Sequence, residues 1–161
     1  MERVLKEDDF IVSKTDLKGK IIYCNQIFMD MAEFSEEELL GKPHNIIRHK
    51  DMPKVVFKYL WDEIKEKREV FAFVINKTKN GNFYWVFANV TATLDERGNI
   101  ISYYSVRRKP NPEAIKVIHP LYLEMIQAEK KGGVDASFKI LSELLESKGV
   151  SYAELIISLQ G

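Results

Sequence analysis

The stretch that decides the fold is residues 70–109, VFAFVINKTKNGNFYWVFANVTATLDERGNIISYYSVRRK. β-branched and aromatic residues, which favour strands, concentrate in three parts of it: 70–77, 83–94 and 100–109. The first two parts are joined through Asn80-Gly81, a dipeptide typical of a tight hairpin, and residues 95–99 form a second polar turn. The stretch therefore predicts three sequential antiparallel strands.

A further hairpin is expected at the other end of the region. Residues 9–25 alternate in polarity around a turn at residues 16–19. With the three later strands, this hairpin gives a five-stranded antiparallel sheet. The helices predicted between the two groups must then lie on one face and enclose a pocket. The expected class is α+β.

Three helical segments are predicted between the strand groups. Apolar residues recur at helical spacing near residues 27–32, and residues 35–38 form a capping box before a second short helix. The longest helix covers residues 53–67 and has proline in its first turn. Its apolar positions form one face: Val56, Phe57, Leu60, Trp61 and Ile64.

After Pro110 the pattern becomes helical. We expect a helix over 113–130 that is interrupted by Pro120, a break at Gly132-Gly133, and a further helix over 134–148. The predicted organisation is a sensory domain over 1–110 and a helical tail over 111–161. An apolar stripe in the tail either packs on its own domain or forms a docking surface for a partner or a second copy: Phe138, Leu141, Leu144 and Leu145.

Composition excludes several classes of protein. The 161 residues include 24 basic and 24 acidic side chains, so no overall field favours a nucleic acid partner. One cysteine and three histidines leave few metal ligands. The charged N-terminus and the lack of a long apolar run predict a cytoplasmic protein without membrane insertion. No motif of a hydrolase nucleophile, phosphate loop or metalloprotease helix is present, so we do not expect an enzyme.

One segment is more specific. Residues 41–53, GKPHNIIRHKDMP, together with residues 21–25 and 105–107, resemble the PAS domain of aerotaxis receptors, over about residues 9–110. The resemblance implies a PAS fold whose pocket holds FAD and a role as a redox or energy sensor in chemotaxis. A PAS domain followed only by helices resembles the stand-alone partner of two-part energy-taxis receptors. This second resemblance implies a membrane-bound chemotaxis-type signalling protein as partner. A homodimer is a further expectation.

The resemblance also implies which residues contact the flavin. They are Asn25, Arg48, His49, Asp51, Trp61 and Asn76. An arginine suits a phosphate or a ring carbonyl, an asparagine offers both a donor and an acceptor, and a tryptophan supplies an aromatic face. By strand alternation, Arg107 is expected to reach the same pocket.

Two other sensor types remain open at this point. A haem-binding gas sensor of this fold would normally need an axial histidine on the long helix, and residues 53–67 contain none. A PAS module that binds a protein and no cofactor is the other alternative. A metal site from His44, His49 and Asp51 is disfavoured by their spacing. Because His44 stands where the related light-sensing flavin domains have cysteine, no photochemical cysteine adduct is expected.

Overall fold

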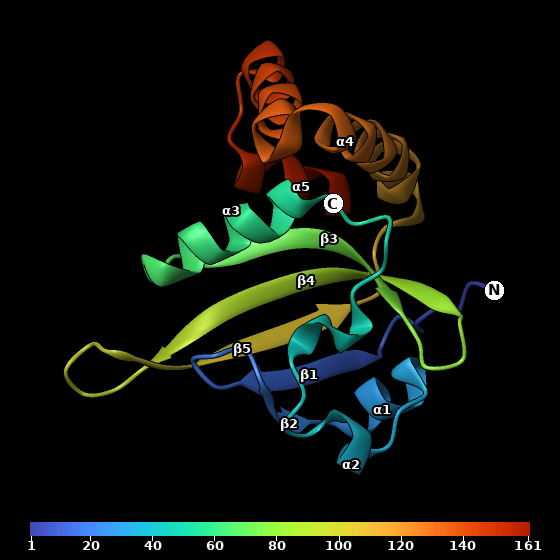
Figure 1. The fold of residues 1–161 in the computed structure, drawn as a ribbon, viewed down its shortest axis with the longest axis vertical. Helices are drawn as coiled ribbons and strands as arrows, with labels where there is room; N and C mark the ends of the chain where they lie inside the picture. Colours follow the sequence, from blue (N-terminus) through green and yellow to red (C-terminus); the bar gives the residue numbers. More distant parts are fainter.

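A computed structural model describes all residues from 1 to 161. Its single sheet has the order β2-β1-β5-β4-β3, and every neighbouring pair is antiparallel (Figure 1). The predicted five-stranded antiparallel sheet is therefore confirmed. The first strand pairs with the last at the centre of the sheet, so the two predicted strand groups form one layer. The strands are β1 (Phe10–Thr15), β2 (Ile21–Cys24), β3 (Val70–Lys77), β4 (Phe83–Leu94) and β5 (Ile100–Arg108).

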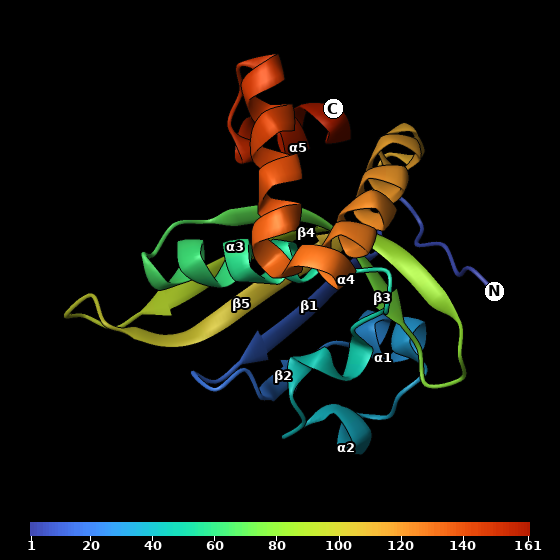
Figure 2. The ribbon, with the colours of Figure 1, turned by 45° about the horizontal axis from the view of Figure 1, so that its top comes forward.

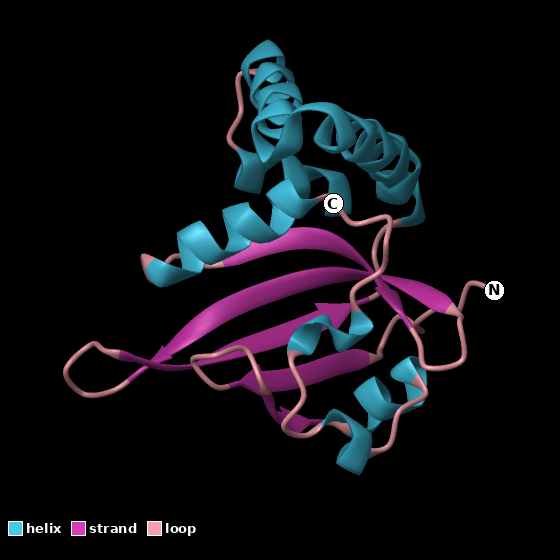
Figure 3. Ribbon diagram, in the orientation of Figure 1, coloured by secondary structure: helices cyan, strands magenta, loops and turns pink.

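Short helices follow the first hairpin and lead to the long one. The Ser35 capping box is present, since its hydroxyl accepts from the amide of Glu38 while the Glu38 carboxylate accepts from Ser35. Figure 3 shows two of these helices near β2 and the long helix near β3. The elements are α1 (Gln26–Ala32), α2 (Glu36–Leu39), η1 (His44–Ile47) and α3 (Lys54–Lys65).

The tail consists of α4 (Pro112–Lys148) and α5 (Tyr152–Gln160). The expected interruption at Pro120 is wrong, because the helix continues through that residue. Pro120 removes only the amide that would bond to the carbonyl of Lys116, and both residues are exposed to solvent, so water can bond that carbonyl. The predicted break at Gly132-Gly133 is confirmed, because Gly133 has non-helical angles, with φ of 70° and ψ of −164°. Figure 2 shows the two arms of α4 forming a V at this break.

The tail packs against the face of β3 and β4 that points away from α3. On that face, Trp85 contacts the rings of His119 and Tyr122, at centroid distances of 5.3 and 6.0 Å. The buried Tyr122 hydroxyl also donates to the carbonyl of Phe73, on the edge strand, at 2.6 Å. Buried tail residues form one continuous core with the sheet: Ala114, Ile118, Tyr122, Met125, Leu141, Tyr152 and Ile156.

The outer edge of β3 is covered as well. Here the sulfur of Met52 accepts from the amide of Ile75 at 3.3 Å, and Arg48 forms an isolated antiparallel bridge to Asn76. An edge strand with covered backbone groups is protected from pairing with other chains. Neither α4 nor any other helix has a segment apolar and long enough to cross a membrane.

Candidate ligand-binding site

A cavity of about 290 Å³ lies between α3, η1 and the sheet. We call it the inner cavity. Helix α3 lines it with Phe57, Leu60, Trp61 and Ile64. The sheet supplies the opposite wall from four strands: Ser13, Thr15, Val74, Asn76, Ala88, Val90, Tyr103, Ser105 and Arg107. Ligand cavities range from about 300 to 1,000 Å³, so this one suits a single ring system whose substituents extend beyond it.

Two aromatic side chains, one from each wall, meet at one end of the inner cavity. Trp61 from α3 meets Tyr103 from β5 edge to face, with centroids 5.2 Å apart and planes at 82°. Both side chains are half-buried. Aromatic faces held in this way offer a planar ligand a large apolar contact surface.

A buried cation lies at the other end. Arg107 is 2% exposed, and its guanidinium donates to the Ser13 hydroxyl at 3.0 Å and lies 3.2 Å from His44 Nε2. It also lies over the ring of Phe28, 4.5 Å from the centroid. Burial lowers the pKa of Arg107 to about 10, so the group stays positive at neutral pH. No carboxylate pairs with it, and an uncompensated buried charge favours an anionic or electron-rich ligand atom.

Three buried polar atoms have no hydrogen-bond partner near this end. They are Asn76 Oδ1, Tyr84 Oη and Arg107 Nε. Asn76 is 3% exposed, and strand pairing places Tyr84 directly opposite it. Because nearly all buried polar groups in folded proteins are hydrogen-bonded, these three atoms need partners from ordered water or from a ligand.

The neighbouring histidine must be neutral. His44 Nε2 faces the donors of Arg107, so it acts as an acceptor and the ring proton lies on Nδ1. Burial, and secondly the Arg107 cation, lower the pKa of His44 to about 3. His44 therefore fixes the orientation of Arg107 across the physiological pH range.

The low pKa of His44 gives the first prediction. Between pH 6.5 and 3 the unfolded chain binds a proton at this residue and the folded protein does not, so stability falls as pH falls through that range. The slope attributable to His44 is up to about 1.4 kcal/mol per pH unit. Urea unfolding from pH 7 to 4 should show a shallower slope for His44→Gln. The same slope in wild type and variant would show that His44 is not buried as the neutral form.

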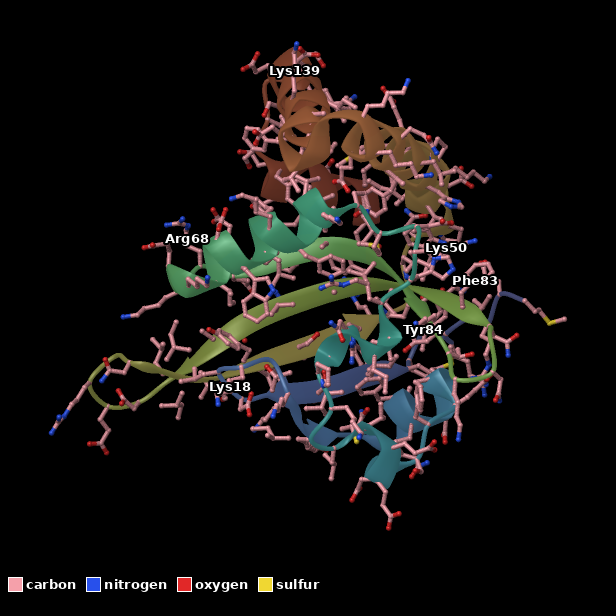
Figure 4. All side chains as sticks on the ribbon, viewed as in Figure 1. Lys18, Lys50, Arg68, Phe83, Tyr84 and Lys139 are labelled. Atoms are coloured by element: carbon pink, nitrogen blue, oxygen red, sulfur yellow. The ribbon has the colours of Figure 1, made fainter.

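A second, more open cavity adjoins the first and is lined by cations. We call it the basic groove; it has a volume of about 520 Å³ and is lined by the cations Arg48, Lys50, Lys54 and Lys77 and by His49, whose pKa is lowered chiefly by burial, with no acidic residue. It shares Arg48 and Phe57 with the inner cavity. The Arg48 guanidinium lies over the Phe57 ring, 3.9 Å from its centroid. Figure 4 shows Lys50 on the same side of the molecule as Phe83, whose ring contacts His49.

The predicted site residues fall into three groups. Arg48, Trp61, Asn76 and Arg107 are brought together around the inner cavity. His49 lines the basic groove. Asp51 and Asn25 line neither.

The side chains of those two residues have structural partners. The Asp51 carboxylate faces His119 of the tail at 3.5 Å. Asn25 caps α1 by accepting from the amide of Phe28, accepts a further bond from Val12, and donates to the carbonyl of Phe10. These three bonds hold α1 against β1 and direct the Asn25 amide to the backbone.

Sequence reasoning missed the partners of Arg107. Arg107 lines the inner cavity, on the face that strand alternation predicted for it with Tyr103 and Ser105, and the same rule applied to β1 points Ser13 to that face. The contact with His44 carried no such signal, because a short helix and loop bring it to the sheet. No group of three histidine, cysteine, aspartate or glutamate side chains could hold a metal ion.

Comparisons with known proteins identify the family and the fold of the chain. Residues 21–107 match a family model described as the PAS fold. The chain is 38% identical over 118 residues to the aerotaxis receptor of Escherichia coli (strain K12), which covers 73% of this chain and 23% of the receptor. It is 22% identical over 105 residues to a nitrogen fixation regulatory protein of Klebsiella oxytoca, covering 65% of this chain and 21% of that protein. The chain thus spans less than a quarter of either relative.

Solved structures share the fold at lower identity. The dark structure of the blue-light photoreceptor Aureochrome1 LOV superimposes with a TM-score of 0.60 at 21% identity, covering 76% of this chain and 99% of that one. A light-oxygen-voltage domain studied with a flavin analogue gives a TM-score of 0.60 at 20% identity, covering 68% and 82%.

Proposed function

Because the chain belongs to the PAS family, we propose that it is a redox or energy sensor in signal transduction that binds FAD in the inner cavity. The observation that carries this proposal is the buried guanidinium of Arg107, which has no carboxylate partner and an unpartnered Nε, together with the unpartnered Asn76 Oδ1. These groups suit the edge of a flavin ring, which carries carbonyl acceptors and an imide donor. A bound flavin would supply a ring that accepts and returns electrons, and its redox state would be the signal that the protein detects.

Each side chain has a distinct part in holding the flavin. Arg107 would donate to a ring carbonyl, while Asn76 Oδ1 would accept from the imide nitrogen. Trp61 and Tyr103 would cover the apolar part of the ring and exclude water. The neutral His44 keeps the guanidinium of Arg107 in place.

The basic groove supports FAD in preference to a smaller flavin. The inner cavity is too small for a complete dinucleotide, and the groove begins where the cavity ends, at Arg48 and Phe57. Its cations Lys50, Lys54 and Lys77 are suited to a pyrophosphate. We therefore propose that the ring occupies the inner cavity and that the phosphates occupy the groove.

The setting of the proposed sensor follows from its relatives. The similarity to an aerotaxis receptor supports a role in aerotaxis or energy taxis, with a membrane-bound chemotaxis-type signalling protein as partner. We propose a cytoplasmic location, and a sensory role in place of a catalytic one. The tail, which continues directly from the cavity-lining strand β5, is the proposed route to the partner.

The second prediction tests this proposal with three flavins. Apo protein titrated with FAD, FMN and riboflavin should quench the flavin fluorescence, and FAD should bind at least about tenfold more tightly than riboflavin, since one charge-assisted hydrogen bond contributes about that much. High salt should reduce the difference. If no flavin binds, the flavin proposal is wrong. If FAD and riboflavin bind equally, the groove does not hold the phosphates.

A further inference from the structure

Helix α3 begins without a capping side chain of its own. Its N-cap is Pro53, whose side chain forms no hydrogen bond to the first turn. The amides of Lys54 and Val55 therefore have no partner within their own segment. A 12-residue helix that lines a ligand cavity needs these groups satisfied if its first turn is to stay fixed.

The missing cap comes from the tail. Glu129 of α4 accepts from the amide of Lys54 at 2.9 Å through Oε1 and from the amide of Val55 at 3.1 Å through Oε2. The Ser137 hydroxyl donates to the same Oε2 at 2.7 Å. Glu129 precedes the Gly133 break and Ser137 follows it, so one carboxylate joins α3 to both arms of α4, which Figure 2 shows as a V.

Two further contacts hold the tail along the same helix and its preceding loop. Asp51, just before α3, lies 3.5 Å from His119. The rings of Tyr59 on α3 and Tyr152 on α5 have centroids 4.5 Å apart. The opposite side of α3 lines the inner cavity. Helix α3 thus has the cavity on one side and the tail on the other.

We propose that Glu129 is a latch that couples the position of α3 to the docking of the tail. Hydrogen bonds weaken steeply with distance and angle, so a small movement of the first turn of α3 breaks both bonds to Glu129 together. Without the two amides that fix it, the carboxylate turns toward solvent and leaves Ser137, which loosens the second arm of α4, residues 134–148, while Leu141 still packs in the core. Occupancy of the inner cavity shifts this equilibrium because the ligand contacts α3 directly. Only the identity of that ligand rests on the proposed function.

The third prediction tests the latch in apo protein by amide hydrogen exchange, measured residue by residue with NMR. Glu129→Gln keeps the size of the side chain but leaves a single acceptor for two amides. Exchange at Lys54 and Val55 and throughout residues 134–148 should rise about fivefold, the effect of losing a cap of typical strength. Glu124→Gln, an exposed residue on the same helix, makes the same change of charge and should change neither.

A second variant separates the two halves of the latch. Ser137→Ala leaves both bonds from Glu129 to α3 in place and removes the bonds of the Ser137 hydroxyl to Glu129 and to the Val134 carbonyl, both of which lie in the tail. Exchange should rise over residues 134–148 and stay unchanged at Lys54 and Val55. If Glu129→Gln affects only Lys54 and Val55, Glu129 is a local helix cap and the latch is disproved.

Adding FAD tests the coupling to the cavity. In the wild type, FAD should slow exchange both at Lys54 and Val55 and over residues 134–148. In Glu129→Gln only the first response should remain, and an unchanged tail response there would overturn the coupling. The visible spectrum reports binding separately. If FAD does not bind, the proposed function is wrong, whereas the latch is still decided by the apo-protein exchange rates.

Discussion

Replacing Tyr122 by alanine is expected to lower the free energy of unfolding by about 3–5 kcal/mol, the range for removing a large buried aromatic side chain. Tyr122 is 2% exposed and packs on Trp85, and its hydroxyl satisfies the carbonyl of Phe73 on the edge strand. The substitution leaves a cavity between tail and sheet and an unpaired buried carbonyl. A loss of this size is a large part of the roughly 5–15 kcal/mol that stabilises a typical domain.

Two further variants show how much of this loss comes from the hydroxyl and whether it is specific to the buried position. Tyr122→Phe removes only the hydrogen bond and should cost about 1–3 kcal/mol, the penalty for leaving a buried acceptor unpaired. Leu123→Ala, at an adjacent residue that is 43% exposed, should change stability little. Urea unfolding followed by circular dichroism measures all three. If Tyr122→Ala behaved like Leu123→Ala, the tail would not share its core with the sheet.

Replacing Arg107 by methionine is expected to weaken FAD binding by about 10–100-fold while leaving the apo protein at least nearly as stable as the wild type. A hydrogen bond from a charged donor contributes about 1.5–3 kcal/mol. In the apo protein the same guanidinium is a buried charge without a carboxylate partner, and replacing buried ionic groups by apolar ones is often neutral or stabilising. The affinity for FAD should therefore fall, while the free energy of unfolding of the apo protein should stay nearly unchanged or rise.

The adjacent arginine provides the control for this variant. Arg108 follows on the same strand but points to the opposite face, where it lies over the Phe87 ring at 5.3 Å. Arg108→Met should leave FAD affinity unchanged. Fluorescence titration and thermal unfolding without flavin measure the two quantities. A strongly destabilised Arg107→Met protein would mean that the bonds to Ser13 and His44 outweigh the cost of the buried charge.

Local patterns in the sequence were enough to predict the sheet. The turn at Asn80-Gly81 and the alternation in residues 100–109 define strands with one side facing inward, and this placed Arg107 in the cavity. The apolar face of residues 53–67 placed Trp61 there too. Both signals act over a few residues and need no knowledge of distant contacts.

The features that could not be predicted depend on contacts between distant segments. A pattern of helical residues does not show which face of the sheet a tail will cover, so the packing of Tyr122 on Trp85 had no sequence signal. Pro120 is tolerated because it lies on an exposed side of α4. The bond from Glu129 to Lys54 joins residues 75 positions apart.

The pairing of β1 with β5 also determines the order in which the molecule can be assembled. Ser13 and Arg107 lie 94 positions apart and meet only when these two strands pair. The hairpin of β3 and β4 closes over a short loop and can form early, whereas closure of the β1–β5 pair carries a larger entropy cost and is expected to be slow. On the ribosome, β1 must wait for β5 to emerge from the exit tunnel. The residues of the candidate ligand site are therefore expected to come together late in folding.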